Sequence, residues 1–175
     1  RKYGYGGYKY DGRWKSVARR MKDYYNLSDT AAILDIGCAK GFILHDFKEL
    51  MPNCTVAGID ISSYAIETAI PSVKSFLTVG SADSLSYPDK SFDLVISINS
   101  IHNLPLDRLK QALREIQRIS RGNSYITVDA WRNEKERDNL FKWVLTAETM
   151  MYVDEWKRIF EEVGYTGDYW WFIAD

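Results

Sequence analysis

Three acidic residues stand at equivalent places along the chain, each where a strand is expected to end. Asp35 lies beside a glycine turn, Asp60 at the end of the second predicted strand, and Asp83 just past the third. Because the carboxyl ends of parallel strands meet along one edge of a sheet, these side chains can line one crevice. The second is suited to accept both hydroxyls of a ribose, and the third a hydrogen bond from an adenine amino group. Singly each could equally cap a helix or cover a turn, but together they favour a shared ligand site.

The segment ILDIGCAKG, residues 33–41, precedes an amphipathic helix and combines an apolar run with a tight turn. Its first half predicts a buried strand. Gly37 and Gly41 allow the backbone to turn sharply and to approach a ligand that a Cβ would push away. The segment therefore predicts a site for a small, adenosine-containing cofactor. Its glycines do not form G-x-G-x-x-G, which disfavours a nicotinamide dinucleotide.

The elements that must position these residues alternate along the chain. Strands are expected at 32–37, 55–60, 76–80, 92–98 and 124–130, with helices between them and a first helix beginning near Trp14. Later residues predict an extra helix from Leu140 to Met151, another at about 153–163, and a final strand in DYWWFIAD. This order predicts an α/β fold, a Rossmann-like, doubly wound, mostly parallel sheet with helices on both faces.

Length and composition predict a single domain over residues 1–175, in which 133–163 form a helical insertion and the final helix. The tyrosine- and glycine-rich residues 1–13 predict a flexible lid over the active site. The alternative is that their tyrosines pack against Trp14 or a partner subunit. These tyrosines are Tyr3, Tyr5, Tyr8 and Tyr10.

Charge and cysteine content narrow the function classes. Lys and Arg number 23 and Asp and Glu 24, for a net charge of −1, and no long block of one sign occurs. We therefore expect no nucleic-acid partner. Cys38 and Cys54 have neither zinc spacing nor disulfide density, which favours the cytoplasm and no metal site. No apolar stretch is long enough to predict a membrane span.

Several motifs resemble those of class I S-adenosylmethionine-dependent methyltransferases, within a small-molecule group similar to the ubiquinone-biosynthesis enzymes. They are ILDIGCAKG, AGIDIS, GSADSLSYPDKSFDLVISI and ALREIQRISRGNSYI, and they lie within about residues 31–130. By this resemblance Asp35, Gly37 and Gly41 surround the methionine part of S-adenosylmethionine, and Asp60 holds the ribose. The cofactor-binding set that the resemblance implies is Asp35, Gly37, Cys38, Ala39, Gly41, Asp60, Ile61, Ser81, Ala82, Asp83, Ile98 and Asn99. Ala39 and Asn123 depart from the family pattern, which often has glycine at both places.

The acceptor side has fewer signals. By the same resemblance, Asn99, His102 and Asn103 of the segment SINSIHNLP should emerge near the sulfonium. His102 is the natural general base, since an unperturbed imidazole titrates near cellular pH. The alternative for His102 is to cap or orient the following helix. Asp129, at the end of the fifth strand, is a second candidate for base or substrate anchor, and His45 is expected to be structural.

We therefore predict methyl transfer from S-adenosylmethionine to an oxygen or nitrogen of a small-molecule acceptor, releasing S-adenosylhomocysteine. His102, Asn99 and Asp129 are the predicted catalytic residues, and a homodimer is possible. The alternatives are a nicotinamide-dependent oxidoreductase and a non-catalytic, cofactor-binding partner subunit.

Overall fold

The structure, a computed structural model, describes residues 9–174. Its elements in chain order are α1 (Lys15–Tyr24), β1 (Ala32–Ile36), α2 (Phe42–Leu50), β2 (Thr55–Asp60), α3 (Ser63–Glu67), η1 (Lys74–Phe76), β3 (Leu77–Val79), β4 (Leu94–Ile98), η2 (Ile101–Asn103), α4 (Leu106–Ile119), β5 (Ser124–Trp131), α5 (Glu134–Trp143), β6 (Met151–Tyr152), α6 (Val153–Val163) and β7 (Asp168–Phe172). Tyr3, Tyr5 and Tyr8 of the predicted lid lie outside the described residues.

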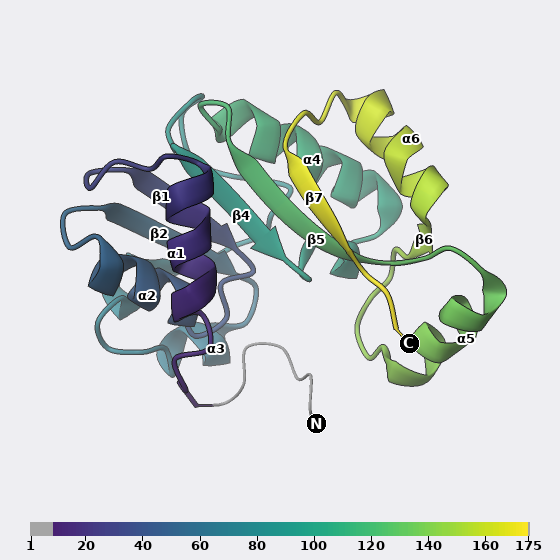
Figure 1. Cartoon of the computed structure of the whole chain (residues 1–175), viewed down its shortest axis with the longest axis horizontal. Helices are drawn as coiled ribbons and strands as arrows, with labels where there is room; N and C mark the ends of the chain where they lie inside the picture. The colour runs from purple at the N-terminus through teal and green to yellow at the C-terminus, as the bar shows by residue number, and fades with distance from the viewer. Residues whose placement is uncertain (1–8, 175) are drawn as a thin grey trace.

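The strands form one seven-stranded sheet, shown in Figure 1. Six follow the order β3-β2-β1-β4-β5-β6, and β7 also pairs with β5. Every strand pair within the described part of the chain is parallel. The predicted Rossmann-like, doubly wound architecture is therefore confirmed, and the carboxyl ends of β1, β2, β4 and β5 share one edge.

Two apolar cores hold helices against the two faces of this sheet. Successive side chains of a strand point to opposite faces. Ile33 and Leu94 accordingly pack in one core with buried residues of α1 and α2. Leu34 and Val95 pack in the other with α4 and α6.

Helices do not cover the whole of the face that carries α1 and α2. In Figure 1, α1 lies over the β1 half, while β5 and β7 lie to its side, with α4 behind them and α6 beside β7. Thr127 of β5 is in register with Trp170 of β7, so both side chains lie on the same face. This face of β5 and β7 forms one wall of a cleft described below.

The predicted helix from Leu140 to Met151 is wrong. The helix in this region is Glu134–Trp143, and the next residues form a connecting segment. Asn133 starts the helix, because its side chain accepts a hydrogen bond from a first-turn N–H. The segment after it is held instead to η2, where the N–H of Thr149 donates to the His102 carbonyl at 2.9 Å. The apolar spacing therefore did not locate the helix, whose start is set by the Asn133 cap.

Candidate functional site

Three neighbouring cavities border the sheet, two at its carboxyl edge and the third over the face of β5 and β7. The first, of about 130 Å³, includes Asp60, Ser81 and Ala82 in its wall; we call it the ribose-side cavity. The second, of about 70 Å³, surrounds the turn after β1 and is called the loop cavity. The third, of about 830 Å³, is the aromatic cleft between α1, β5 and β7. Gly37 borders the first two cavities, and Trp14 and Ile98 border both the second and the third, so the three are neighbours.

The two glycines of the turn serve different purposes. Gly37 has φ +79°, and a Cβ there would lie 1.9 Å from Ser100 Oγ. Gly41 has φ +76°, but its missing Cβ would face Val73 at 2.8 Å and Leu77 at 3.0 Å, inside the core. Gly37 therefore keeps open the turn at the ligand cavities, whereas the packing of the core below requires glycine at position 41.

Asp60, the last residue of β2, binds this turn through hydrogen bonds. Its carboxylate accepts hydrogen bonds from the backbone N–H of Ala39 at 2.8 Å and of Ser62 at 2.9 Å. Ala39 has φ +45°, a conformation that costs a non-glycine residue free energy. The Asp60 carboxylate thus supports a strained turn and also faces the ribose-side cavity, beside Ile61, which is exposed.

Asp35 is a buried carboxyl group that lines the loop cavity together with Cys38 and Ala39. Burial, with a smaller contribution from the charge of Asp60, raises the pKa of Asp35 to about 8. No hydrogen bond or ion pair from the described residues reaches its carboxylate. A cation in the loop cavity would therefore favour the ionised form of Asp35 and gain an electrostatic partner.

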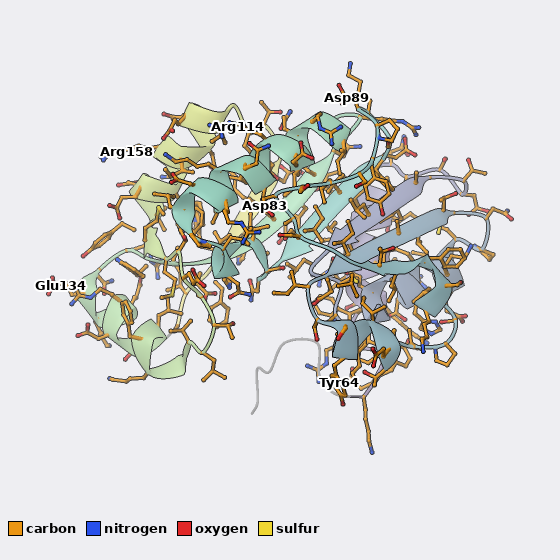
Figure 2. All side chains as sticks on the ribbon, turned by 180° about the vertical axis from the view of Figure 1, so that it is seen from behind. Tyr64, Asp83, Asp89, Arg114, Glu134 and Arg158 are labelled. Atoms are coloured by element: carbon orange, nitrogen blue, oxygen red, sulfur yellow. The ribbon has the colours of Figure 1, made fainter. Side chains whose placement is uncertain are left out.

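Asp83 does not line any of the three cavities, although its neighbours Ser81 and Ala82 do. Figure 2 shows it beside α4 in the middle of the molecule. Arg108 of α4 donates to Asp83 Oδ2 at 2.5 Å, and the Ser81 hydroxyl donates to Oδ1. Hydrogen bonding by Arg108 lowers the pKa of Asp83 to about 2. The expected contact of Asp83 with adenine stays a prediction, and it would have to coexist with this ion pair.

His102 and Asp129 lie together, but beneath the cavities rather than in their walls. The His102 ring is buried, and its Nδ1 accepts a hydrogen bond from the Asp129 backbone N–H at 3.1 Å. Burial lowers the pKa of His102 to about 4, so the ring is neutral near pH 7. With Nδ1 as acceptor, a neutral ring carries its proton on Nε2, 3.8 Å from Asp129 Oδ2. The lone pair that a general base needs is therefore already engaged.

Asp129 itself is buried at the end of β5. Burial raises the pKa of its carboxyl to about 6. Its Oδ1 has no hydrogen-bond partner among the described residues. His102 thus contacts the Asp129 backbone through its ring and the segment after α5 through its carbonyl. Its predicted role as general base stays untested.

Aromatic side chains from three separate parts of the chain line the largest cavity. Trp14 and Tyr25 come from the α1 region, Tyr125 from β5, and Trp170 and Phe172 from β7. The sequence did not single out the β7 residues for function. Strand alternation could have indicated one of them, because neighbouring residues of a strand point to opposite faces. Trp171 packs on Phe160 in the core, and its neighbour Trp170 is 68% exposed on the other face.

Two further predicted residues have structural partners. His45 Nδ1 lies 2.7 Å from Ser72 Oγ, in agreement with a structural role. Tyr10, the one described tyrosine of the predicted lid, donates a hydrogen bond to Asp46 and packs edge-on against the His45 ring. Tyr10 is therefore held on α2.

Comparison with known proteins identifies the family. The chain belongs to the methyltransferase-domain family, whose profile matches residues 27–164. Together with the sheet topology, this match makes it a class I S-adenosylmethionine-dependent methyltransferase, as the motifs predicted. The fold is similar to that of the YcgJ protein from Bacillus subtilis, with a TM-score of 0.67 at 18% identity over 85% of this chain and 67% of that one.

One relative and one structure correct our expectations about the acceptor. A tRNA (carboxymethyluridine(34)-5-O)-methyltransferase from Arabidopsis thaliana is 32% identical over 146 residues, 82% of this chain, which spans only 34% of the Arabidopsis enzyme. A Haloferax volcanii methyltransferase in complex with the Trm112 activator shares the fold, with a TM-score of 0.65 at 16% identity over 87% of this chain and 76% of that one. These findings overturn the expectation of a small-molecule acceptor without a nucleic-acid partner.

The physical reason is that net charge averages over the whole chain. α1 carries Lys15, Arg19, Arg20 and Lys22 against the single acid Asp23, although the chain as a whole is nearly neutral.

Within residues 9–174, no group of three or more His, Cys, Asp and Glu residues could hold a metal ion. None of the helices described is long and apolar enough to cross a membrane.

Proposed function

We propose that this chain binds S-adenosylmethionine across the ribose-side and loop cavities and transfers its methyl group to an oxygen or nitrogen of an acceptor held in the aromatic cleft. The continuity of the three cavities carries this proposal. Gly37 joins the first two, and Trp14 with Ile98 joins the second to the third. A ligand that fills the first two cavities therefore ends beside the third.

The residues present suit this cofactor. The buried Asp35 carboxylate, without a partner among the described residues, suits the cationic methionine end. Asp60 would hold the ribose hydroxyls, and Ser81 with Ala82 would border the adenine. When bound, the cofactor supplies an electrophilic methyl group.

The chain's own contribution to the reaction is mainly to position the acceptor and to exclude water. Aromatic walls hold a flat acceptor in one orientation next to Ile98 and Asn99, at the end of β4. Holding two reactants in line can lower a barrier by several kcal/mol. Because His102 Nδ1 is engaged by Asp129, we assign no proton transfer to its ring.

A nucleobase in RNA is the acceptor class that we propose. Unstacked bases bind single-strand sites by stacking on aromatic side chains and on Arg guanidinium groups. The cleft offers Trp14, Tyr125, Trp170 and Phe172 together with Arg20. The name of the Arabidopsis relative supports the same class.

The test is methylation of RNA with methyl-labelled S-adenosylmethionine. The purified chain is incubated with unfractionated tRNA, with the same tRNA digested to nucleosides, and with a metabolite extract. We expect label in intact tRNA. Label confined to low-mass products would contradict the RNA class, and absence of S-adenosylhomocysteine binding would contradict the function as a whole. Bound S-adenosylhomocysteine without any labelled product would support the non-catalytic alternative.

A pair of variants links that activity to the cleft. Trp170→Ala should lower tRNA labelling by about tenfold, since stacking contributes about 1–3 kcal/mol per base. Its affinity for S-adenosylhomocysteine should not change. Phe76→Ala is the matched control, because Phe76 is also an exposed aromatic residue but lines none of the three cavities. Equal activity of the two variants would remove Trp170 from the acceptor site.

A further inference from the structure

One polar residue in the aromatic cleft has an unusual backbone. Asn99 follows β4 and has φ +49°, in the left-handed region that non-glycine residues seldom adopt. It lines the cleft next to Ile98, which the cleft shares with the loop cavity, as it shares Trp14. Strained residues of this kind persist where the surrounding contacts hold them, and they concentrate at functional sites.

Thr127 of β5 provides the contacts that hold Asn99. The Thr127 hydroxyl oxygen accepts a hydrogen bond from the Asn99 backbone N–H at 2.9 Å. The same hydroxyl donates its proton to Asn99 Oδ1 at 2.6 Å. The amide oxygen is thereby engaged, and the Nδ2 amino group of Asn99 has no partner among the described residues. The group that Asn99 can offer to an acceptor is consequently an N–H donor.

This donor restricts what can react beside it. A neutral amine nitrogen has one lone pair, which it needs for the attack on the methyl carbon. An aliphatic alcohol would have to lose its proton to a base, and His102 Nδ1 is engaged by Asp129. An oxygen that is already ionised has lone pairs both for the attack and for the Asn99 N–H group, and a charge-assisted hydrogen bond of this kind is a strong one.

We propose that the acceptor is an oxygen acid, an acidic hydroxyl or carboxyl group on the ring, and that it binds as an oxyanion hydrogen-bonded to Asn99 Nδ2. The proposal rests on the proposed function and specifies its acceptor atom. The acceptor loses its proton to solvent before the transfer. In the step itself, the oxyanion forms the new O–C bond as the C–S bond breaks, the sulfonium becomes a neutral thioether, and no proton moves.

Two groups of opposite charge, Arg20 of α1 and Asp168 of β7, also line the cleft. They act in opposite directions on the pKa of Tyr125, which Asp168 raises and Arg20 lowers. Asp168 also accepts a hydrogen bond from the Tyr25 hydroxyl at 2.9 Å. Asp168 is in register with Tyr125, two residues before Thr127, and is thus displaced along the strand from Asn99.

The remaining titratable groups near the cleft do not offer a competing positive charge. Four tyrosines line it, and burial raises the pKa of Tyr25 and of Tyr125, which keeps both phenols neutral near pH 7. His102 and Asp129 are buried and line none of the three cavities.

The experiment uses 4-nitrophenol, a phenol that changes colour when it ionises near neutral pH. The chain is saturated with S-adenosylhomocysteine, and the absorbance of the bound probe is followed against pH. We expect binding of the phenolate about tenfold tighter than binding of the phenol, which lowers the pKa of the bound probe by about one unit. Thr127→Val, which removes the hydroxyl but keeps the shape, should abolish the shift, and Thr127→Ser should retain it.

Each outcome decides the proposal. A bound probe whose pKa is unchanged or raised, a shift that survives in Thr127→Val, or no binding up to the solubility limit of the probe would overturn it. S-adenosylhomocysteine affinity is measured in the same samples by calorimetry. Normal affinity with no probe shift means that the oxyanion proposal alone has failed, whereas loss of S-adenosylhomocysteine binding by the wild-type chain means that the proposed function has failed.

Discussion

The ends of β1 and β2 border cavities of about 70 and 130 Å³, each of which has one carboxylate, Asp35 or Asp60, and the turn at Gly37 in its wall. The end of β4 and the first half of β5, together with β7, border a cleft of about 830 Å³ walled by aromatic rings from distant segments. Following the proposed function, we call these the cofactor side and the acceptor side. The cofactor side depends on a short stretch of chain with fixed backbone angles. The acceptor side depends on which side chains the fold brings together.

The comparison predicts that small backbone changes damage the cofactor side most. Gly37→Ala should lower the free energy of unfolding by about 2–5 kcal/mol, through left-handed strain and the collision with Ser100. S-adenosylhomocysteine binding should be lost in calorimetric titration.

Gly164→Ala is the matched control for Gly37→Ala. Gly164 has φ +69° but open space where its Cβ would lie, so it should cost only about 1–2 kcal/mol and leave binding intact. The double variant Gly37→Ala with Ser100→Gly should recover part of the stability. If Gly37→Ala bound normally, the turn would not be the tightly constrained half of the site.

A single carboxylate should have the next largest effect. Asp60→Ala should weaken S-adenosylhomocysteine binding by about tenfold to a hundredfold, because charge-assisted hydrogen bonds contribute about 1.5–3 kcal/mol. Calorimetry measures the affinity, and circular dichroism checks the fold. Asp93→Ala is the control. The Asp93 carboxylate accepts hydrogen bonds from Arg121 and from the Ala32 N–H, and Asp93 lines none of the three cavities. Unchanged affinity in Asp60→Ala would remove this residue from the site.

The variant His102→Ala distinguishes a catalytic role of His102 from a positioning role. If His102 is the general base, His102→Ala should lower the methylation rate by about 10² to 10⁴, and the acid limb of the pH profile should vanish. From its engaged Nδ1 and a pKa of about 4, we expect instead a loss of about tenfold through displaced neighbours, with the pH profile unchanged in shape. Stopped-time assays across pH 3–9, a range that includes a pKa of about 4, decide between the two results.

The last prediction concerns the pH dependence of cofactor binding and is confined to the cofactor side. Asp35 has a pKa of about 8 in the free protein, and a cationic ligand favours its ionised form. Binding below about pH 8 must therefore release a proton, so affinity should fall by about tenfold for each unit of acidification and level off above pH 8. Calorimetry in buffers of different ionisation enthalpy measures that proton. The slope should be absent in Asp35→Asn, and an equal slope in that variant would assign the titration to another group.

The sequence by itself determined the class of fold and the cofactor side. Strand and helix periodicities are local, so β1, β2, β4 and β5 and the helices between them could be placed from the printed residues. The turn at Gly37 and the carboxylates Asp35 and Asp60 follow from that order, because every parallel strand brings its carboxyl end to the same edge. The predicted helix over Leu140–Met151 failed because an apolar stripe carries less positional information than the Asn133 cap.

Only the tertiary structure decided the acceptor side. Whether His102 can accept a proton depends on a single contact with Asp129, in the next strand of the sheet. The cleft is lined both by Trp14 from the α1 region and by Trp170 of β7, which are far apart in the chain. The hold of Thr127 on Asn99 likewise exists only once β4 and β5 are paired. Such contacts depend on the packing of distant segments, and neither local periodicity nor net charge contains that information.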